Sequence, residues 1–202
     1  MKSKIGLIGG SFNPIHKAHI AAAECFLDAL QLDKCVFMPT NISPFKTASA
    51  SALKISAEHR LECVRLALKN NPKLEISSYE IDKGDISYTY ETILYLKNKY
   101  PDSELFFLIG GDSASHFRKW RNWEKILNEA QICIVPREDK DFDQFKISEE
   151  LTIDGRSPIY IKFPLMNISS TEIRNLIKSG QAISDLVPPE VEDYIITHRL
   201  YQ

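Results

Sequence analysis

The stretch GGSFNPIHKAH, residues 9–19, decides the fold class because it joins an extended apolar segment to a helical one. The preceding residues, 4–8, have the composition of a strand, and the two glycines after them allow a tight turn that a ligand can approach. Asn13 is a favoured N-cap residue, and the proline after it suits the first position of a helix. The stretch therefore predicts a strand, a glycine turn and a helix over 14–30 that begins at Asn13.

Two histidines, His16 and His19, are three residues apart and would share one face of the first two turns of that helix. The free N–H groups and the positive dipole end of a helix favour an anion there, with the imidazoles as additional donors. A metal site is disfavoured, because two histidines supply too few ligands and His59, His116 and His198 are distant in sequence. No Gly-Lys-Ser/Thr follows, so the stretch is not a Walker A loop. Phosphate binding and a capped helix with two idle histidines both stay open.

Short apolar runs alternate with helical periodicity along the rest of the chain. Strands or extended segments are expected at 4–8, 35–38, 73–81, 104–109, 131–135 and 158–163. Helices are expected at 14–30, 56–69, 89–99, 113–118, 123–129, 170–179 and 189–198. This alternation predicts an α/β fold, a Rossmann-like, doubly wound and mostly parallel sheet with helices on both faces, in a single domain over 1–202. Residues 40–54 are expected to form a loop, and the charged segment 137–156 a mobile excursion.

Composition narrows the classes of function. The chain has 202 residues, 44% of them hydrophobic and 26% charged, with a net charge of −2, as is typical of a globular protein with a sizeable core. No stripe of Lys and Arg indicates nucleic-acid binding, and no run approaches the ~18 apolar residues of a membrane span. The four cysteines form no C-x-x-C pair, which favours buried thiols in a reducing compartment. With no visible signal peptide, we expect a cytoplasmic protein that binds small molecules and neither nucleic acid nor membranes, and homo-oligomerisation stays open.

A second stretch, ISSTEIR at 168–174, precedes another helix. Its S-x-x-E pattern, Ser169 to Glu172, is typical of a capping box and needs no function. The same stretch also offers a helix start, further hydroxyls and an arginine whose planar donors suit a phosphate. Because the Ser169 hydroxyl is occupied by the cap, the phosphate candidates are Ser170, Thr171 and Arg174.

Together the two stretches resemble the H-x-G-H and ISSTEIR signatures of nucleotidyltransferases of the α/β-phosphodiesterase superfamily. Within it, nearly the whole chain resembles the nicotinate-nucleotide adenylyltransferase family. The matching segments are GGSFNPIHKAH (9–19), SPFK (43–46), SYTYET (87–92), FFLIGGDSASHFRKW (106–120), IVPR (134–137), ISSTEIR (168–174) and VPPEVEDYIITHRLY (187–201). One such match would be weak, but seven in the expected order are specific.

The resemblance implies transfer of the adenylyl group of ATP to nicotinate mononucleotide, giving nicotinate adenine dinucleotide and pyrophosphate in NAD biosynthesis. The acceptor phosphate would attack the α-phosphorus of ATP in line, without a covalent enzyme intermediate. Because a phosphate monoester is largely ionised at pH 7, no strong general base is needed, and catalysis depends on positioning and charge stabilisation. Mg²⁺ would be carried mainly by the ATP phosphates and water, as this ion often is.

By the same resemblance, the expected catalytic residues are His16, His19 and Arg174. The expected ATP-binding residues are Gly9, Gly10, Ser11, Phe12, His16, His19, Gly111, Asp112, Ile168, Ser170, Thr171 and Arg174. The expected residues for nicotinate mononucleotide are Ser11, Phe12, Lys46, Tyr88, Thr89, Trp120 and Arg121. In this assignment Trp120 stacks on the pyridine ring, and backbone amides near Thr89 and Arg121 take the nicotinate carboxylate.

Several of these residues have a structural alternative. Trp120 could be a core aromatic, although its polar surroundings favour a ligand role, and Trp123 is expected in the core. Gly111 and Asp112 follow a strand, where a capped turn would also explain them. His198, in the closing segment, is expected to be structural.

Three positions depart from the family pattern. Ala18 replaces the glycine usual between the histidines and adds a methyl group near the expected adenosine contact. Asn13 stands where many relatives carry Asp, and both residues cap helices. Phe45 replaces the histidine usual before Lys46, so one donor to the mononucleotide phosphate is missing there.

Rival functions share some of these features. The same chemistry could serve nicotinamide mononucleotide or phosphopantetheine, and the full set of matches disfavours the second. A non-catalytic nucleotide-binding sensor of the same fold is disfavoured by His16, His19 and Arg174. A structural or interaction domain leaves the motifs unexplained. The preference for the acid or the amide acceptor depends on a few backbone amides and stays open.

Overall fold

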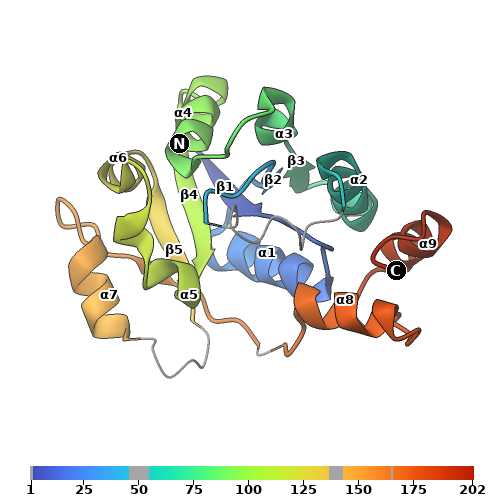
Figure 1. Cartoon of the computed structure of the whole chain (residues 1–202). Helices are drawn as coiled ribbons and strands as arrows, with labels where there is room; N and C mark the ends of the chain where they lie inside the picture. The colour runs from blue at the N-terminus through green and yellow to red at the C-terminus, as the bar shows by residue number, and fades with distance from the viewer. Residues whose placement is uncertain (1, 46–54, 137–142, 165) are drawn as a thin grey trace. The chain divides into compact units, whose positions relative to one another are not determined.

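The computed structural model describes residues 2–45, 55–136, 143–164 and 166–202 (Figure 1). Its strands are β1 (Ser3–Gly10), β2 (Lys34–Pro39), β3 (Leu74–Ile76), β4 (Ser103–Gly110), β5 (Gln131–Val135) and β6 (Ile159–Tyr160). Its helices are α1 (Lys17–Leu30), α2 (Ala57–Leu68), α3 (Tyr79–Lys83), α4 (Thr89–Lys99), α5 (Gly111–Ala114), α6 (Trp123–Glu129), α7 (Gln144–Leu151), α8 (Ser170–Lys178) and α9 (Pro189–Thr197), with a 3-10 turn η2 (Phe117–Lys119).

Within the described part of the chain, six strands form one sheet in the order β3-β2-β1-β4-β5-β6. The pairs β1–β4, β4–β5 and β5–β6 are parallel, with Leu108 of β4 opposite Ile8 of β1 and Cys133 of β5. This is the strand order of a Rossmann-like doubly wound sheet, whose winding reverses between β1 and β4. The predicted α/β fold class is confirmed.

The central strands are apolar along their length because both of their faces are covered. Residues 5–8 of β1 and 105–109 of β4 are buried, as expected for parallel strands under helices. Gly6 lets helix α1 approach closely, since a Cβ atom there would lie 2.8 Å from Cε1 of Phe26 and 2.9 Å from Cδ1 of Leu32. The sheet thus places the carboxyl ends of β1 and β4, where the two glycine pairs stand, at one edge.

The chain divides into two compact units that are interleaved in sequence. Unit 1 comprises Met1–Gly9, Glu24–Val36 and Tyr88–Leu165, and unit 2 comprises Gly10–Ala23, Phe37–Ser87 and Met166–Gln202. Unit 1 contains the strands from β4 to β6, whereas unit 2 contains most of the 9–19 stretch and all of ISSTEIR. The expectation of a single domain over 1–202 stays a prediction.

Predicted helices and strands are confirmed where the pattern that predicts them lies within the element itself. The helix at 89–99 and the strand at 131–135 coincide with α4 and β5 residue for residue. Helix α2 begins after Ser56, whose hydroxyl accepts from the N–H of His59 in an N-cap. None of the helices among the described residues combines the length and apolar character needed to cross a membrane.

Two predicted elements are interrupted in the structure. In one, the interruption lets a side chain form a hydrogen bond, and in the other it buries a side chain. The extended segment expected at 73–81 ends early: helix α3 follows β3, the Ser78 hydroxyl donates to Asp82 at 2.6 Å, and Gly84, with φ 77°, ends the helix. The helix expected at 113–118 is split into α5 and the turn η2. This break buries Phe117 and stacks the ring of Trp120 on it.

Two further predictions fail toward the end of the sheet. The segment 137–156 contains helix α7, which is capped by Asp143 and buries Ile147 and Leu151, one turn apart, so the expected mobile excursion is wrong for this part. Residues 137–142 lie outside the described residues. The strand expected at 158–163 is limited to β6, because its partner β5 ends at Val135.

Candidate active site

The segment between β1 and α1, residues 11–16, is a loop, and the prediction that the helix begins at Asn13 is wrong. Asn13 does not cap the helix, since its side-chain Oδ1 accepts a hydrogen bond from the Tyr201 hydroxyl at 2.7 Å. The peptide bond between Asn13 and Pro14 is cis. Helix α1 therefore starts at Lys17, one residue after His16.

Phe12 forms the centre of this loop. Its φ of 44° lies in the left-handed region, where a bulky side chain costs about 1–3 kcal/mol unless the surroundings hold it. The ring is buried, 5.4 Å from the ring of Phe37 and edge-on to His19 at 5.2 Å between centroids. Burial of the ring thus offsets part of the backbone cost and connects the loop to the histidines.

The two histidines are adjacent although only His19 is helical. Their rings stack at 3.7 Å between centroids with an angle of 25°. The backbone N–H of His16 donates to Nδ1 of His19 at 3.3 Å, which assigns the proton of the neutral His19 ring to Nε2. His16 is buried and His19 half-buried. The Nε2–H group of His19 is therefore a donor whose orientation is set by the loop.

The ISSTEIR stretch begins helix α8 as predicted. Ser169 is its N-cap and accepts from the N–H of Glu172 at 3.1 Å, which confirms the local capping interpretation. Arg174, one turn later, donates to the carbonyl of Asn13 at 2.7 Å and to the Thr171 hydroxyl at 3.0 Å. These bonds join the two signature stretches within unit 2.

The hydroxyl of Ser170 adds a second link between the two stretches. It donates to the carbonyl oxygen of Pro14 at 2.9 Å. Ser170 is half-buried and Thr171 exposed at the first turn of α8. Both predicted phosphate candidates thus stand at a helix start, where backbone N–H groups and the dipole favour an anion.

Arg60 of helix α2 contacts this loop, although no role for it was predicted from the sequence. Its side chain is 3% exposed and donates to the carbonyls of Ser11 at 2.7 Å and Asn41 at 3.1 Å. Burial, the largest cause, lowers the pKa of its guanidinium. The sequence signal that could have indicated its burial is helical spacing, because Arg60 stands three and four residues before the buried Cys63 and Val64 of the same helix.

Tyr201 is a second contact of the loop, and the resemblance of the closing segment, 187–201, assigned it no role. Its hydroxyl reaches Asn13, and burial, the largest cause, raises the pKa of this phenol above its usual value. The neighbouring guanidinium groups of Arg174 and Arg60 lower the pKa by smaller amounts. The phenol is thus a neutral donor beside two cations.

The residues predicted to bind the nicotinate ring lie in unit 1. Trp120 is half-buried and stacks on Phe117, with centroids 5.0 Å apart and an angle of 27°. Arg121 is exposed, and its guanidinium carbon lies 4.6 Å from the centre of the Tyr88 ring. The hydrogen bond with Tyr88 is the main cause that raises the pKa of Arg121. Thr89 begins helix α4 directly after Tyr88.

The remaining predicted residues fall into three settings. Gly9 is exposed at the end of β1, and the buried Gly111 and exposed Asp112 open α5 directly after β4. Half-buried positions in unit 2 are Gly10, Ser11, Ala18 and Ile168. Phe45 is 60% exposed, and Lys46 lies outside the described residues.

Two structural expectations have different outcomes. Trp123 is half-buried with the Arg118 guanidinium 5.1 Å from its ring centre, so its expected place in the core is wrong. Trp123 is the first residue of α6, whose buried residues are Ile126 and Leu127. His198 contacts the Tyr194 carbonyl at 2.9 Å and the Tyr194 ring, as a structural residue would.

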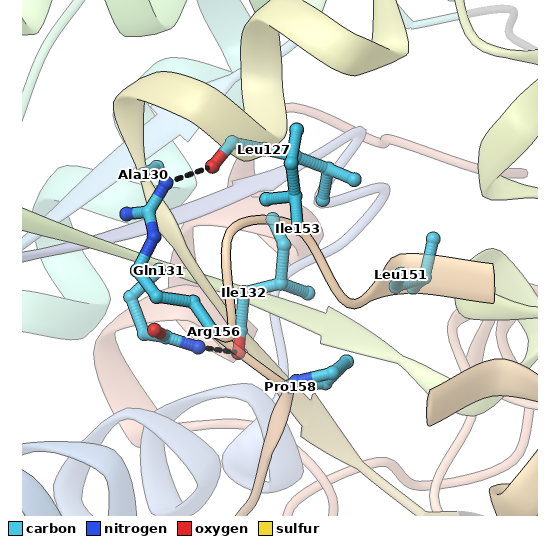
Figure 2. Close-up of a pocket in the computed structure, with 8 residues that line it drawn as sticks. All are labelled: Leu127, Ala130, Gln131, Ile132, Leu151, Ile153, Arg156 and Pro158. Carbon is cyan, nitrogen blue, oxygen red and sulfur yellow. Dashed lines mark hydrogen bonds between the residues drawn. The ribbon is translucent and has the colours of Figure 1, made fainter. Parts of the chain in front are cut away.

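A hollow of about 180 Å³ in unit 1 is lined by residues of α6, β5 and α7 and of the segment after α7 (Figure 2). Its lining includes Leu127, Ile132 and Leu151, and Arg156 beside it donates to the carbonyl of Leu127 at 2.7 Å. The arginine satisfies the last carbonyls of α6, so the hollow is part of the packing of that helix.

Comparisons with known proteins agree with the motifs. A family model described as cytidylyltransferase-like matches residues 7–176. The probable nicotinate-nucleotide adenylyltransferase of Lachnoclostridium phytofermentans is 37% identical to this chain, and the match covers 98% of each of the two chains. The protein of the same name from Staphylococcus epidermidis is also 37% identical, with coverage of 100% of this chain and 98% of the relative. The structure of Plasmodium falciparum nicotinic acid mononucleotide adenylyltransferase complexed with NaAD shares the fold, with a TM-score of 0.80, 22% identity and coverage of 98% of this chain and 97% of that one. The chain is thus a member of the nicotinate-nucleotide adenylyltransferase family, one of the cytidylyltransferase-like proteins.

Proposed function

We propose that this protein transfers the adenylyl group of ATP to nicotinate mononucleotide, releasing pyrophosphate and nicotinate adenine dinucleotide, a reaction of NAD biosynthesis. Its membership of an adenylyltransferase family supports this enzyme activity. Within the molecule, the observation that carries the proposal is the bond from Arg174 to the carbonyl of Asn13 at 2.7 Å. It joins the helix start of ISSTEIR to the loop that holds the paired histidines.

The proposed ATP phosphate site uses the donors of unit 2. His19 donates through Nε2–H, because its Nδ1 already accepts from the backbone of His16. Arg174 and the first turn of α8 supply further donors, and the adenosine contacts are assigned to the glycines at the ends of β1 and β4. The proposed ATP-binding residues remain Gly9, Gly10, Ser11, Phe12, His16, His19, Gly111, Asp112, Ile168, Ser170, Thr171 and Arg174.

The chemical step requires no covalent intermediate. A phosphate oxygen of the acceptor attacks the α-phosphorus of ATP, the bond to the β-phosphate breaks, and pyrophosphate leaves with the electron pair. The acceptor phosphate is already largely ionised near neutral pH. The residues therefore act by holding the two substrates in line and by stabilising charge on the α-phosphate and the leaving pyrophosphate.

The proposed acceptor site uses the aromatic and cationic residues of unit 1. Trp120 would stack on the pyridine ring, and backbone amides near Thr89 and Arg121 would bind the carboxylate. The exposed guanidinium of Arg121, close to the Tyr88 ring, adds positive charge that favours the acid over the amide. The remaining proposed contacts are Ser11, Phe12 and Lys46.

Mg²⁺ fits this site as an ion carried by the substrate. Among the described residues, no three His, Cys, Asp or Glu side chains are grouped to hold a metal. The donors of the loop and of α8 are imidazole, hydroxyl and guanidinium groups, which suit phosphate oxygens. We therefore place Mg²⁺ on the ATP phosphates and water, where it would neutralise charge on the departing pyrophosphate. The cytoplasmic location and the oligomeric state stay predictions.

An acceptor comparison tests the proposed function. The purified protein is incubated with ATP, Mg²⁺ and either nicotinate or nicotinamide mononucleotide, and pyrophosphate release is measured. We expect release with nicotinate mononucleotide and at least about 10-fold lower kcat/KM with the amide, since one unpaired charged contact costs about 1.5–3 kcal/mol. Faster turnover of the amide would favour the rival acceptor. No release with either acceptor would favour a nucleotide sensor.

Replacing Trp120 with alanine is expected to raise the KM for nicotinate mononucleotide about 5- to 100-fold, because stacking of a base on an aromatic ring contributes about 1–3 kcal/mol. The KM for ATP should change less than about 2-fold. Trp123→Ala is the matched control, since that ring contacts Arg118 and is not assigned to a substrate. Equal effects of the two variants on both KM values would contradict the stacking role.

A further inference from the structure

We propose that Arg60 and Tyr201 are positioning residues for adenylyl transfer: they hold the loop 11–14 in the conformation that orients His16 and His19. This inference rests on the proposed function for its effect on turnover, but its geometric part stands on the contacts of unit 2 alone. Neither residue belongs to the two signature stretches, and neither is assigned to a substrate.

The first step is the backbone of Phe12, whose φ of 44° is unfavourable for an aromatic residue. Such a conformation persists only when neighbouring contacts determine it. The carbonyl groups of the two residues that neighbour Phe12, Ser11 and Asn13, each accept a guanidinium bond at 2.7 Å. Arg60 supplies the first and Arg174 the second. Arg60 therefore fixes the Ser11–Phe12 peptide unit directly before the unfavourable residue, and Arg174 fixes the Asn13–Pro14 peptide unit one residue beyond it.

The second step is the burial of Arg60. A guanidinium with 3% exposure loses most of its hydration, and an apolar side chain of similar volume would be less costly to bury. Its bonds go to two backbone carbonyls, Ser11 and Asn41, and not to a carboxylate partner at those atoms. The planar fork of donors is suited to this double contact, and Lys could not reproduce it. Arg60 thus serves the shape of the loop.

The third step is the hydroxyl of Tyr201. It donates to Oδ1 of Asn13 at 2.7 Å and so fixes the side chain of a loop residue. Because burial raises the pKa of this phenol, it stays a protonated donor throughout the neutral range. Leu200 beside it is buried, which anchors the segment after α9. Helix α9 is itself bound to α2 by an ion pair between Lys69 and Glu190 at 2.9 Å.

A change in the conformation of the loop 11–14 would alter the positions of both histidines. His16 follows the loop 11–14 after one intervening residue, Ile15, and its backbone N–H contacts Nδ1 of the His19 ring. A displacement of about 1 Å in a catalytic group can lower a rate about 10²-fold. Loss of one clamp bond should therefore affect turnover more than it affects binding of either substrate.

The test replaces Tyr201 with phenylalanine, which keeps the ring and removes the donor to Asn13. Tyr194→Phe is the matched control, because its hydroxyl contacts His59 at 2.9 Å on the same helix pair without reaching the loop. We expect Tyr201→Phe to lower kcat about 10-fold, as for an unsatisfied buried acceptor, with both KM values within about 2-fold. Tyr194→Phe should keep kcat within about 2-fold.

Two further readouts separate positioning from loss of folding. In a double-mutant cycle, Tyr201→Phe should lower kcat by less than about 2-fold further when it is added to Asn13→Ala. The reason is that both substitutions remove the same hydrogen bond. Arg60→Lys should lower kcat in the same direction with native circular dichroism. An unchanged kcat in Tyr201→Phe, or full additivity with Asn13→Ala, would overturn the proposal.

The NMR signals of the histidine rings test the geometry independently of activity. Tyr201→Phe should shift the ring C–H signals of His16 and His19, whereas Tyr194→Phe should shift those of His59 and His198 only. Unshifted His16 and His19 signals in Tyr201→Phe would overturn the positioning role even if the protein is active. Shifted signals in a protein without adenylyl transfer would instead contradict the proposed function and leave the clamp supported.

Discussion

His19→Ala is expected to lower kcat for adenylyl transfer about 10²- to 10³-fold, the range for loss of one preorganised donor to a charged transition state. Because Nδ1 of the ring accepts from the backbone N–H of His16, Nε2–H is the proposed donor to phosphate. The ring is half-buried and meets Phe12 edge-on, so its removal should cost the fold little. Steady-state kinetics and thermal unfolding of the same preparation measure the two effects.

Two variants make this result specific. His198→Ala removes a ring that contacts Tyr194 and should keep kcat within about 2-fold. His19→Gln keeps an N–H donor on a flexible chain and should recover part of the rate. A fall in unfolding temperature that accounts for the lost activity of His19→Ala would favour two structural histidines.

Arg174→Ala is expected to lower kcat/KM about 10³-fold, because it removes a charged phosphate donor and also the bond to the Asn13 carbonyl. Arg174→Lys keeps the charge but loses the planar fork that now spans Asn13 and Thr171. It should therefore lose about 10²-fold, between wild type and alanine. The measurement is pyrophosphate release at varied ATP concentration.

The matched control is Lys178→Ala, which removes an exposed cation from the last turn of the same helix. It should leave kcat/KM within about 2-fold, because this end of α8 is assigned to no substrate. Equal losses in Arg174→Ala and Lys178→Ala would show that the general positive charge of α8, and not the position of Arg174, supports binding.

Local signals in the sequence were sufficient for much of the fold. The helix at 89–99 follows from its periodicity, and the cap at Ser169 follows from an interaction that spans three residues. The alternation of strands and helices predicted the doubly wound class, which the strand order confirms. Helix α7 was missed, since its charged surface residues hide an apolar pair that only packing reveals.

The candidate site was predicted unevenly for the same reason. Motif resemblance pointed to His16, His19 and Arg174, and the structure brings their two stretches into contact. It assigned no role to Arg60, which lies in none of the matching segments, or to Tyr201, which closes the last of them. Their partners are backbone carbonyls and an amide oxygen, groups that leave no recognisable pattern in the sequence.

The sequence by itself determined the α/β class and the cap of α8, since these depend on periodicity and on contacts within a few residues. The identity of the phosphate donors is a prediction from the resemblance of the two signature stretches. Only the tertiary structure decided that α1 begins at Lys17, that Phe12 adopts a left-handed conformation and that His19 presents Nε2–H. The physical reason is that buried polar groups must find partners wherever the chain supplies them. In this protein the partners of the loop come from helices α2 and α8 and from the segment after α9.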